Sequence, residues 1–332
     1  MRALTLLLTS IACSSGDAAP DKPRRWIAGD VHMHVNPPDD DVELSVEGVA
    51  REAKAAGMEW VVLTPHLWGN ARGDRYDRDW IDMARRARAI KDIVLVPGIE
   101  WTTRDGHFTV VGVDVPSLDR DLLASAKSKG AFISVNHPFA VPTRIPGVSA
   151  SHYDLSYRAW SEGSGPVAPV GGVEVWNVPL GFANMISRPG GMTGETRAWL
   201  EADKLARSKR QRVAAVGGTD NHKRAVMPTT WILATDTTEM SVLDALKAGA
   251  TCVGGIEAGT LEARTIGAWV RIGEIVNGPS VELRWKGTAQ LFIDGTDLGD
   301  KTSGYVHAAG SLPHTYRIVV GGSRCGFVYA NL

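Results

Sequence analysis

Long apolar segments are absent from the 332-residue sequence. No run of about 20 apolar residues occurs, which excludes a polytopic membrane protein. Neither sign of charge is in excess, because 36 Lys and Arg residues are balanced by 37 Asp and Glu residues. This balance and the lack of a basic stripe argue against nucleic-acid binding through bulk charge. Hydrophobic residues make up 44% of the chain, enough for a large core, so we expect a folded protein.

Cysteine is also scarce, with three residues in the chain. The first, Cys13, follows a short apolar segment preceded by Arg2, and a stretch of small and polar residues comes after it. This arrangement resembles a bacterial lipoprotein signal. We therefore expect a signal peptide over residues 1–12, lipidation of Cys13 and a polar tether over 13–25. The protein would be exported to the periplasm or outer membrane and held there by lipid alone; the alternative is a plain secretory signal.

The other two cysteines, Cys252 and Cys325, lack the CxxC spacing of a structural zinc site. In an exported chain they can pair as a disulfide, and they can equally stay as two buried thiols. The sequence leaves both alternatives open.

Short apolar runs alternate with longer amphipathic stretches through the middle of the chain. The pattern predicts strands over 26–34, 59–66, 92–101, 107–115, 131–138, 171–177, 212–222 and 229–236. It predicts helices over 46–57, 77–91, 118–130, 193–210 and 241–250. Such alternation indicates a parallel sheet with crossover helices and favours a (β/α) barrel. After about residue 258 only strand-like runs occur, so we expect a barrel over 26–257 and a small β-rich domain over 258–332.

Histidines gather at the ends of the predicted strands. Six of the nine lie there, His107 at the start of its strand after the Glu100 loop, with two carboxylates on the same strands: His32, His34, His66, His107, His137 and His222, with Glu100 and Asp220. The carboxyl-end face of a parallel barrel carries the active site, so these side chains are predicted to converge. Imidazole and carboxylate ligands suit Zn, Mn or Fe. Eight ligands exceed the need of one ion and indicate at least two.

The same motifs resemble those of the PHP family, the polymerase and histidinol phosphatase metallohydrolases. They are GDVHMH ending at His34, LTPH at His66, PGIEWT around Glu100, GHF at His107, NHP at His137 and GGTDNH ending at His222. GHFTVVGVD and GVEVWN are most similar to the carbaryl-hydrolase-like branch. The resemblance covers residues 26–255 and implies a distorted (β/α)7, TIM-like barrel with two or three divalent ions.

The resemblance also implies a ligand set. The first ion would take His32, His34, Glu100 and Asp220, and the second would share Glu100 and add His107 and His137. A third, optional ion would take His66, His222 and an acidic residue after the HxH motif. Counting from His34 favours Asp39 or Asp40 for that residue, and counting back from Ser45 favours Asp41. Glu174 would support a ligand or face the substrate, unless it pairs with a neighbouring arginine.

These observations predict a metal-dependent hydrolase that attacks a small-molecule ester with a metal-bridging hydroxide. Glu100 would bridge the ions, and His222 or His66 would protonate the leaving group if no third ion binds. The family favours a phosphoester; the carbaryl-hydrolase-like branch makes a carboxyl or carbamate ester the alternative. A non-catalytic binding protein on the same fold is the alternative from another class. Nucleic acid is not expected as a partner, and the sequence leaves the oligomeric state open.

Overall fold

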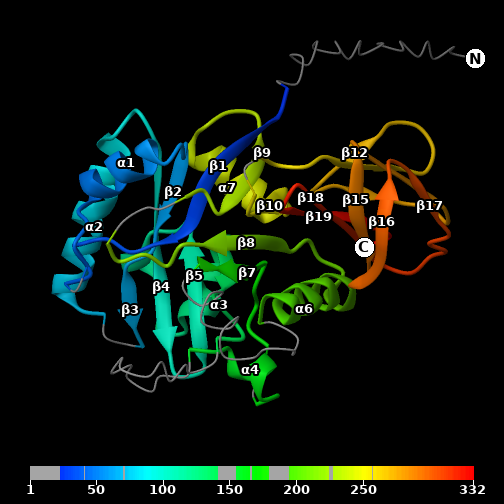
Figure 1. Cartoon of the computed structure of the whole chain (residues 1–332). Coiled ribbons are helices and arrows are strands. Elements are labelled where there is room, and N and C mark those ends of the chain that lie inside the picture. Colours follow the sequence, from blue (N-terminus) through cyan, green and yellow to red (C-terminus); the bar gives the residue numbers. More distant parts are fainter. Residues whose placement is uncertain are drawn as a thin grey trace, which may run out of the picture.

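The computed structural model describes residues 23–40, 42–69, 72–140, 155–164, 167–178, 194–223, 227–255 and 257–332. Within these residues the protein is a mixed α/β structure built on one large sheet, with helices packed beside it and a strand-rich end (Figure 1). No helix in the described part of the chain is both long enough and apolar enough to cross a membrane.

Each strand and helix predicted between residues 26 and 250 overlaps an observed element. The strands are β1 (Arg25–Met33), β2 (Trp60–Leu63), β4 (Val94–Thr103), β5 (Gly106–Val111), β6 (Phe132–Val135), β7 (Gly172–Asn177), β8 (Ala214–Gly218) and β9 (Thr230–Ala234). The helices are α1 (Val46–Ala55), α2 (Asp74–Ala89), α3 (Leu122–Ser128), α6 (Gly194–Lys209) and α7 (Glu239–Ala248). The pattern did not predict β3 (His66–Trp68), β10 (Thr251–Val253), α4 (Arg158–Ser161) or the short 3-10 helix η1 (Val115–Ser117).

The helices form where a cap and an apolar stripe coincide. In α1 the Ser45 side chain accepts a hydrogen bond from the backbone N–H of Gly48, which satisfies one free donor of the first turn. Val46, Val49 and Ala53 are buried on one side of this helix, as the 3.6-residue period requires. In α2 the buried side is formed by Trp80, Met83, Ala84 and Ala87. Both helices lie against the strands that carry the candidate site (Figure 1).

The strand directions correct one prediction. β1, β2 and β4 are parallel, and so are β6, β7 and β8, but β5 runs antiparallel to both of its neighbours, β4 and β6. β9 is also antiparallel to β1. The expectation of a parallel sheet was therefore wrong at β5, which follows β4 through a tight hairpin, and at β9.

The far strand of this series returns to the first one. Beyond β8, Asp220 donates its backbone N–H to His32 O at 2.9 Å, and His34 donates to Asn221 O at 3.2 Å. One parallel bridge, Met33–Asn221, joins the two segments. A closed (β/α)7 barrel is not shown by this pairing, because β1 continues through β9 into further strands. The return nevertheless brings the ends of β1 and β8 together, and this positions the site.

The region after residue 257 contains strands and no helix. Four strands form a separate sheet in the order β12 (Val270–Arg271), β11 (Leu261–Arg264), β14 (Val281–Trp285) and β17 (Tyr305–His307). The others extend the large sheet through β10: β19 (Ser323–Ala330), β18 (His314–Val320), β15 (Thr288–Ile293) and β16 (Thr296–Thr302), with β13 (Ile275–Val276) beside β19. Phe327 and Tyr329 of β19 belong to the main apolar core. Strands from both sides of the predicted boundary thus share one sheet, and the division into two domains stays a prediction.

A disulfide links the two regions. Cys252 of β10 and Cys325 of β19 are directly opposite in the antiparallel pair and are bonded, 73 positions apart in sequence. A crosslink that closes a loop of this length lowers the entropy of the unfolded chain. This stabilises the folded protein by on the order of 4 kcal/mol. We expect the Cys252→Ser/Cys325→Ser protein to melt several degrees below the oxidised wild type in calorimetry. Two findings together would contradict the pairing. One is two titratable free thiols in the native oxidised protein, and the other is a double variant that melts at the same temperature as the wild type.

Candidate metal centre

The candidate ligands meet at one edge of the large sheet. His32 and His34 lie at the end of β1, His66 begins β3, and Glu100 lies in the last part of β4. His137 follows β6, and Asp220 and His222 follow β8. His107 belongs to the same edge because β5 starts where β4 ends, so its reversed direction explains a ligand at the start of a strand. The structure therefore brings all eight predicted side chains together.

Glu100 lies at the centre of the cluster and is 1% exposed. Its Oε1 is 3.2 Å from both His32 Nε2 and His107 Nδ1, and 3.4 Å from His137 Nε2. Its Oε2 is 2.9 Å from His66 Nδ1 and 3.6 Å from His34 Nε2. One buried carboxylate thus contacts five imidazoles. This is the arrangement expected of a ligand shared between two ions.

His32 provides a direct test of whether the site fits a metal ion. The ring is fully buried, and its Nε2 has no hydrogen-bond partner. That atom is also 3.4 Å from Asp220 Oδ1, so it faces two carboxylates without a well-aligned hydrogen bond to either. An unpartnered buried nitrogen is costly in a folded protein. A cation bound between Nε2 and these oxygens would remove that cost, so the site fits a metal.

Four overlapping groups have ligand atoms close enough to hold an ion, within 4.8 Å of one another. They are His32–His34–Glu100, Glu100–His107–His137, His32–His137–Asp220 and His34–His66–His222. The first two match the predicted division into two ions around Glu100. The last contains His66 and His222 of the predicted third site, with His34 in place of the acidic residue, and the ring centroids of His34 and His222 are 4.0 Å apart. Imidazole and carboxylate donors of this kind suit Zn, Mn or Fe.

The acidic residue predicted for a third ion can now be placed in part. Asp39, one of the alternatives, is buried: its Oδ2 is 2.9 Å from His34 Nδ1, and both its oxygens accept from the backbone N–H of His66. Asp40 is 72% exposed and pairs with Arg75, so the structure does not bring it to the cluster. Asp41 lies outside the described residues.

Charge coupling shifts the pKa values of the ligands. Burial alone would lower the pKa of His32, but the carboxylates of Asp220 and Glu100 raise it well above its usual range. Burial likewise opposes a charged His34, yet its contacts with Asp220 and Asp39 raise its pKa to about 9. In turn, burial would raise the pKa of Glu100, and the surrounding imidazoles hold it well below normal.

His107 and His222 behave differently. Burial lowers the pKa of both rings, and the charge of His34 lowers that of His222 further. The Nδ1 of His222 is 3.3 Å from Asp220 O, which can only accept, so the proton of the neutral ring lies on Nδ1. Its Nε2 then carries the lone pair that a metal requires.

Glu174 pairs with no arginine among the described residues and instead contacts the ligands. Its Oε1 is 3.1 Å from His32 Nδ1, and its Oε2 accepts from the backbone N–H of His137 at 2.6 Å. A carboxylate on the second nitrogen of a ligating histidine fixes the ring and directs the other nitrogen toward the ion. Glu174 therefore supports two of the ligands.

Three further residues support the site, and the sequence analysis did not single them out. Asn136 donates to Glu100 Oε1 at 2.9 Å. Asn177 donates to Asp220 Oδ2 at 3.2 Å. Asp30 is buried between the ends of β1 and β8 and accepts from His32 N and from Thr219; burial raises its pKa to about 6. Asn136 adjoins His137 in sequence, and Asp30 precedes His32 by two residues, on the same face of β1.

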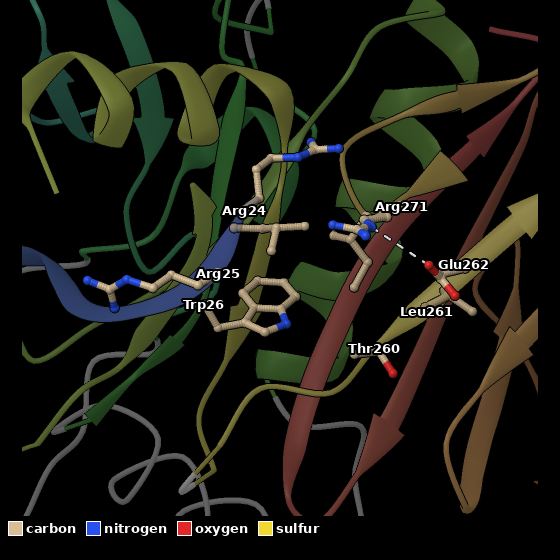
Figure 2. A pocket seen from close by; sticks show the side chains of 9 residues that line it. Arg24, Arg25, Trp26, Thr260, Leu261, Glu262 and Arg271 are labelled. Atoms are coloured by element: carbon tan, nitrogen blue, oxygen red, sulfur yellow. Dashed lines mark ion pairs between the residues drawn. The ribbon is translucent and has the colours of Figure 1, made fainter. Parts of the chain in front are cut away.

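A well-formed cavity lies at the other end of β1. It has a volume of about 290 Å³ and is lined by Arg24, Arg25, Trp26 and Arg271, among others. Figure 2 shows Arg24 and Arg25 extending in different directions, with Arg271 paired to Glu262. Arg24 pairs with Glu274, and Arg25 with Glu59. The cationic side chains are thus paired with carboxylates, and this cavity contains no group of side chains like the ligand cluster.

Comparison with known proteins adds little. No family model matches the chain, and no curated protein matches it. Among solved structures, it is similar to a two-domain protein from Bacteroides vulgatus ATCC 8482 that contains a predicted PHP-like metal-dependent phosphoesterase. The identity is 16% and the TM-score 0.46, over 92% of this chain and 95% of that one. A similarity of this size does not establish a shared fold or activity.

Proposed function

We propose that this protein is a metal-dependent hydrolase of the PHP type, and specifically a phosphoesterase. The contact of the buried Glu100 carboxylate with five imidazoles carries the proposal. The buried Nε2 of His32 supports it, because this atom has no well-aligned hydrogen bond and a cation between it and the facing carboxylates would satisfy it. The order of the sequence motifs supports the family, and its carbaryl-hydrolase-like branch is part of the same proposal.

Different residues of the site would have different roles in ester hydrolysis. Two or three divalent ions, when bound, would supply an acidified water and polarise the ester oxygen under attack. His32, His34, His107, His137, Glu100 and Asp220 would hold two ions. Glu174 and Asn136 keep His32 and Glu100 in place through hydrogen bonds. If two ions bind, His66 and His222 are the nearest groups that can give the leaving group a proton.

A substrate panel tests the proposed reaction. Purified protein is analysed for metal and then assayed on an aryl phosphate, an aryl phosphodiester and an aryl carbamate. We expect turnover of a phosphoester that depends on the bound metal. Turnover of the carbamate alone would replace the phosphoesterase proposal by the ester alternative. Bound metal without turnover of any ester would favour a binding protein.

Loss of metal is expected to destabilise the fold. An ion that binds the native state at one hundred times its dissociation constant stabilises it by about 2.7 kcal/mol. Chelator-treated protein should therefore melt several degrees lower than protein resupplied with Zn, Mn or Fe. The His32→Ala variant should lose most of this metal-dependent shift. Identical melting curves with and without metal, together with no metal in the purified protein, would contradict the metal centre.

We further propose that the protein is exported and tethered through lipid on Cys13. The arrangement around Cys13 supports this, and the segment itself lies outside the described residues. In a bacterial host, Cys13→Ala should release the protein from the membrane fraction or block processing of the signal. Fractionation and mass spectrometry of the mature N-terminus decide it. A soluble wild-type protein with its N-terminus at another residue would overturn the lipid anchor.

A further inference from the structure

An exposed tryptophan adjoins the candidate metal centre. Trp68 is 56% exposed, and it is the one aromatic side chain among the large exposed hydrophobic residues of the described chain. It lies two positions after His66 on β3, so both side chains are on the same face of the strand. The ring centroids of His66 and Trp68 are 4.8 Å apart, with an angle of 35° between the rings. The indole is therefore one imidazole away from the ligand atoms.

The backbone around Trp68 is held firmly. Trp68 is paired with Thr102 of β4, and the next residue, Gly69, donates its N–H to Thr102 O at 2.7 Å. The indole N–H of Trp101 donates to Gly69 O at 2.8 Å. Leu67, the residue before Trp68, is buried in the core. These contacts fix the strand, so the exposed indole is presented from a rigid support.

We propose that Trp68 is a stacking platform for a flat aromatic group of the substrate. The inference rests on the proposed ester hydrolysis and names the substrate class. An ester whose reacting centre lies among the ligand atoms must extend one substituent past the rim of the cluster, and Trp68 occupies the rim next to His66. An exposed indole offers a wide face on which a planar ring stacks with offset geometry. The preferred substrate is therefore an aryl-bearing ester.

Two matched phosphate esters test this. Benzyl phosphate and cyclohexylmethyl phosphate have similar leaving groups but differ in the planarity of the ring. For Trp68→Ala, we expect kcat/KM for the benzyl ester to fall about tenfold, the size of an aromatic stacking contact. The cyclohexylmethyl ester should change much less, and Trp68→Phe should keep most of the preference. Ile266→Ala, at a residue 97% exposed in the C-terminal region, is the control and should change neither ester.

Binding provides a second measurement that needs no turnover. Calorimetry with benzylphosphonate and cyclohexylmethylphosphonate on the metal-loaded protein should show the same loss of aromatic preference in Trp68→Ala, with metal content unchanged. Equal effects of the substitution on both ligands, or no effect on either, would overturn the role of Trp68. If the wild type hydrolyses neither ester, the phosphoesterase proposal fails, and the binding preference still decides on Trp68. No binding of either phosphonate would overturn the platform as well.

Discussion

Glu100→Gln is expected to reduce activity by at least about 10³-fold and to lower metal occupancy at both ions. Glutamine keeps the shape of the side chain but loses its negative charge. Asn136 donates to Oε1, so the glutamine oxygen would stay there and its NH₂ would take the Oε2 position. That group would face His66 Nδ1 and His34 Nε2, where the structure has an acceptor oxygen. Two cations would then repel each other with no charge between them. Metal analysis and kcat/KM measure both effects.

Two further variants separate metal chemistry from general damage. Asp220 Oδ1 is 3.1 Å from His34 Nε2 and 3.4 Å from His32 Nε2. Asp220 therefore contacts two imidazoles at these distances, whereas Glu100 contacts five. Asp220→Asn should therefore deplete mainly one ion. His307 hydrogen-bonds to Tyr316 in the strand-rich region, and His307→Gln should leave metal content and turnover unchanged. If Glu100→Gln retains two tightly bound ions and near-normal turnover, the bridging role is wrong.

Much of this site could be predicted because its ligands follow short, strongly apolar strands. Each strand has a local hydrophobic pattern, and parallel strands end at one face, so sequence alone brings His32, His137 and Asp220 together. His107 was placed at the start of its strand without a physical account. In the structure β5 begins at Gly106, and Gly106 pairs with Thr103 at the end of β4, so the chain reverses through Arg104 and Asp105 and this reversal explains the position of His107.

Other features depend on pairing that the local pattern does not contain. The choice among Asp39, Asp40 and Asp41 could not be made by counting, because the segment after His34 is irregular. Of the two alternatives that the structure describes, burial against His34 and His66 N places Asp39 at the site, and Asp40 lies away from it. The pairing of β10 with β19 joins residues more than 70 positions apart in sequence. No periodicity encodes that register, and for this reason the sequence could not decide whether Cys252 and Cys325 pair.

The support of His32 by Glu174 depends on a glycine. A Cβ at Gly218 would lie 2.2 Å from Glu174 Oε1 and 2.4 Å from His32 Cβ, so only a glycine leaves room for the two side chains to meet. The carboxylate then accepts on both oxygens, from His32 Nδ1 and from His137 N. With Nδ1 protonated, the lone pair of His32 lies on Nε2, the atom that faces Glu100 and Asp220.

Glu174→Gln is expected to weaken metal binding by about 10- to 100-fold at the ion held by His32. The glutamine oxygen can accept from His137 N, but its NH₂ then faces His32 Nδ1. That nitrogen must become an acceptor, which moves the proton to Nε2 and blocks the lone pair that a metal needs. The alternative orientation places two donors together at His137 N, which is also unfavourable. Competition with a chelator measures the dissociation constant of each of the two ions separately. Glu262→Gln, at a carboxylate remote from the centre, is the matched control. Unchanged affinity in Glu174→Gln would show that Glu174 does not set the tautomer of His32, and that His32 is oriented by its other contacts.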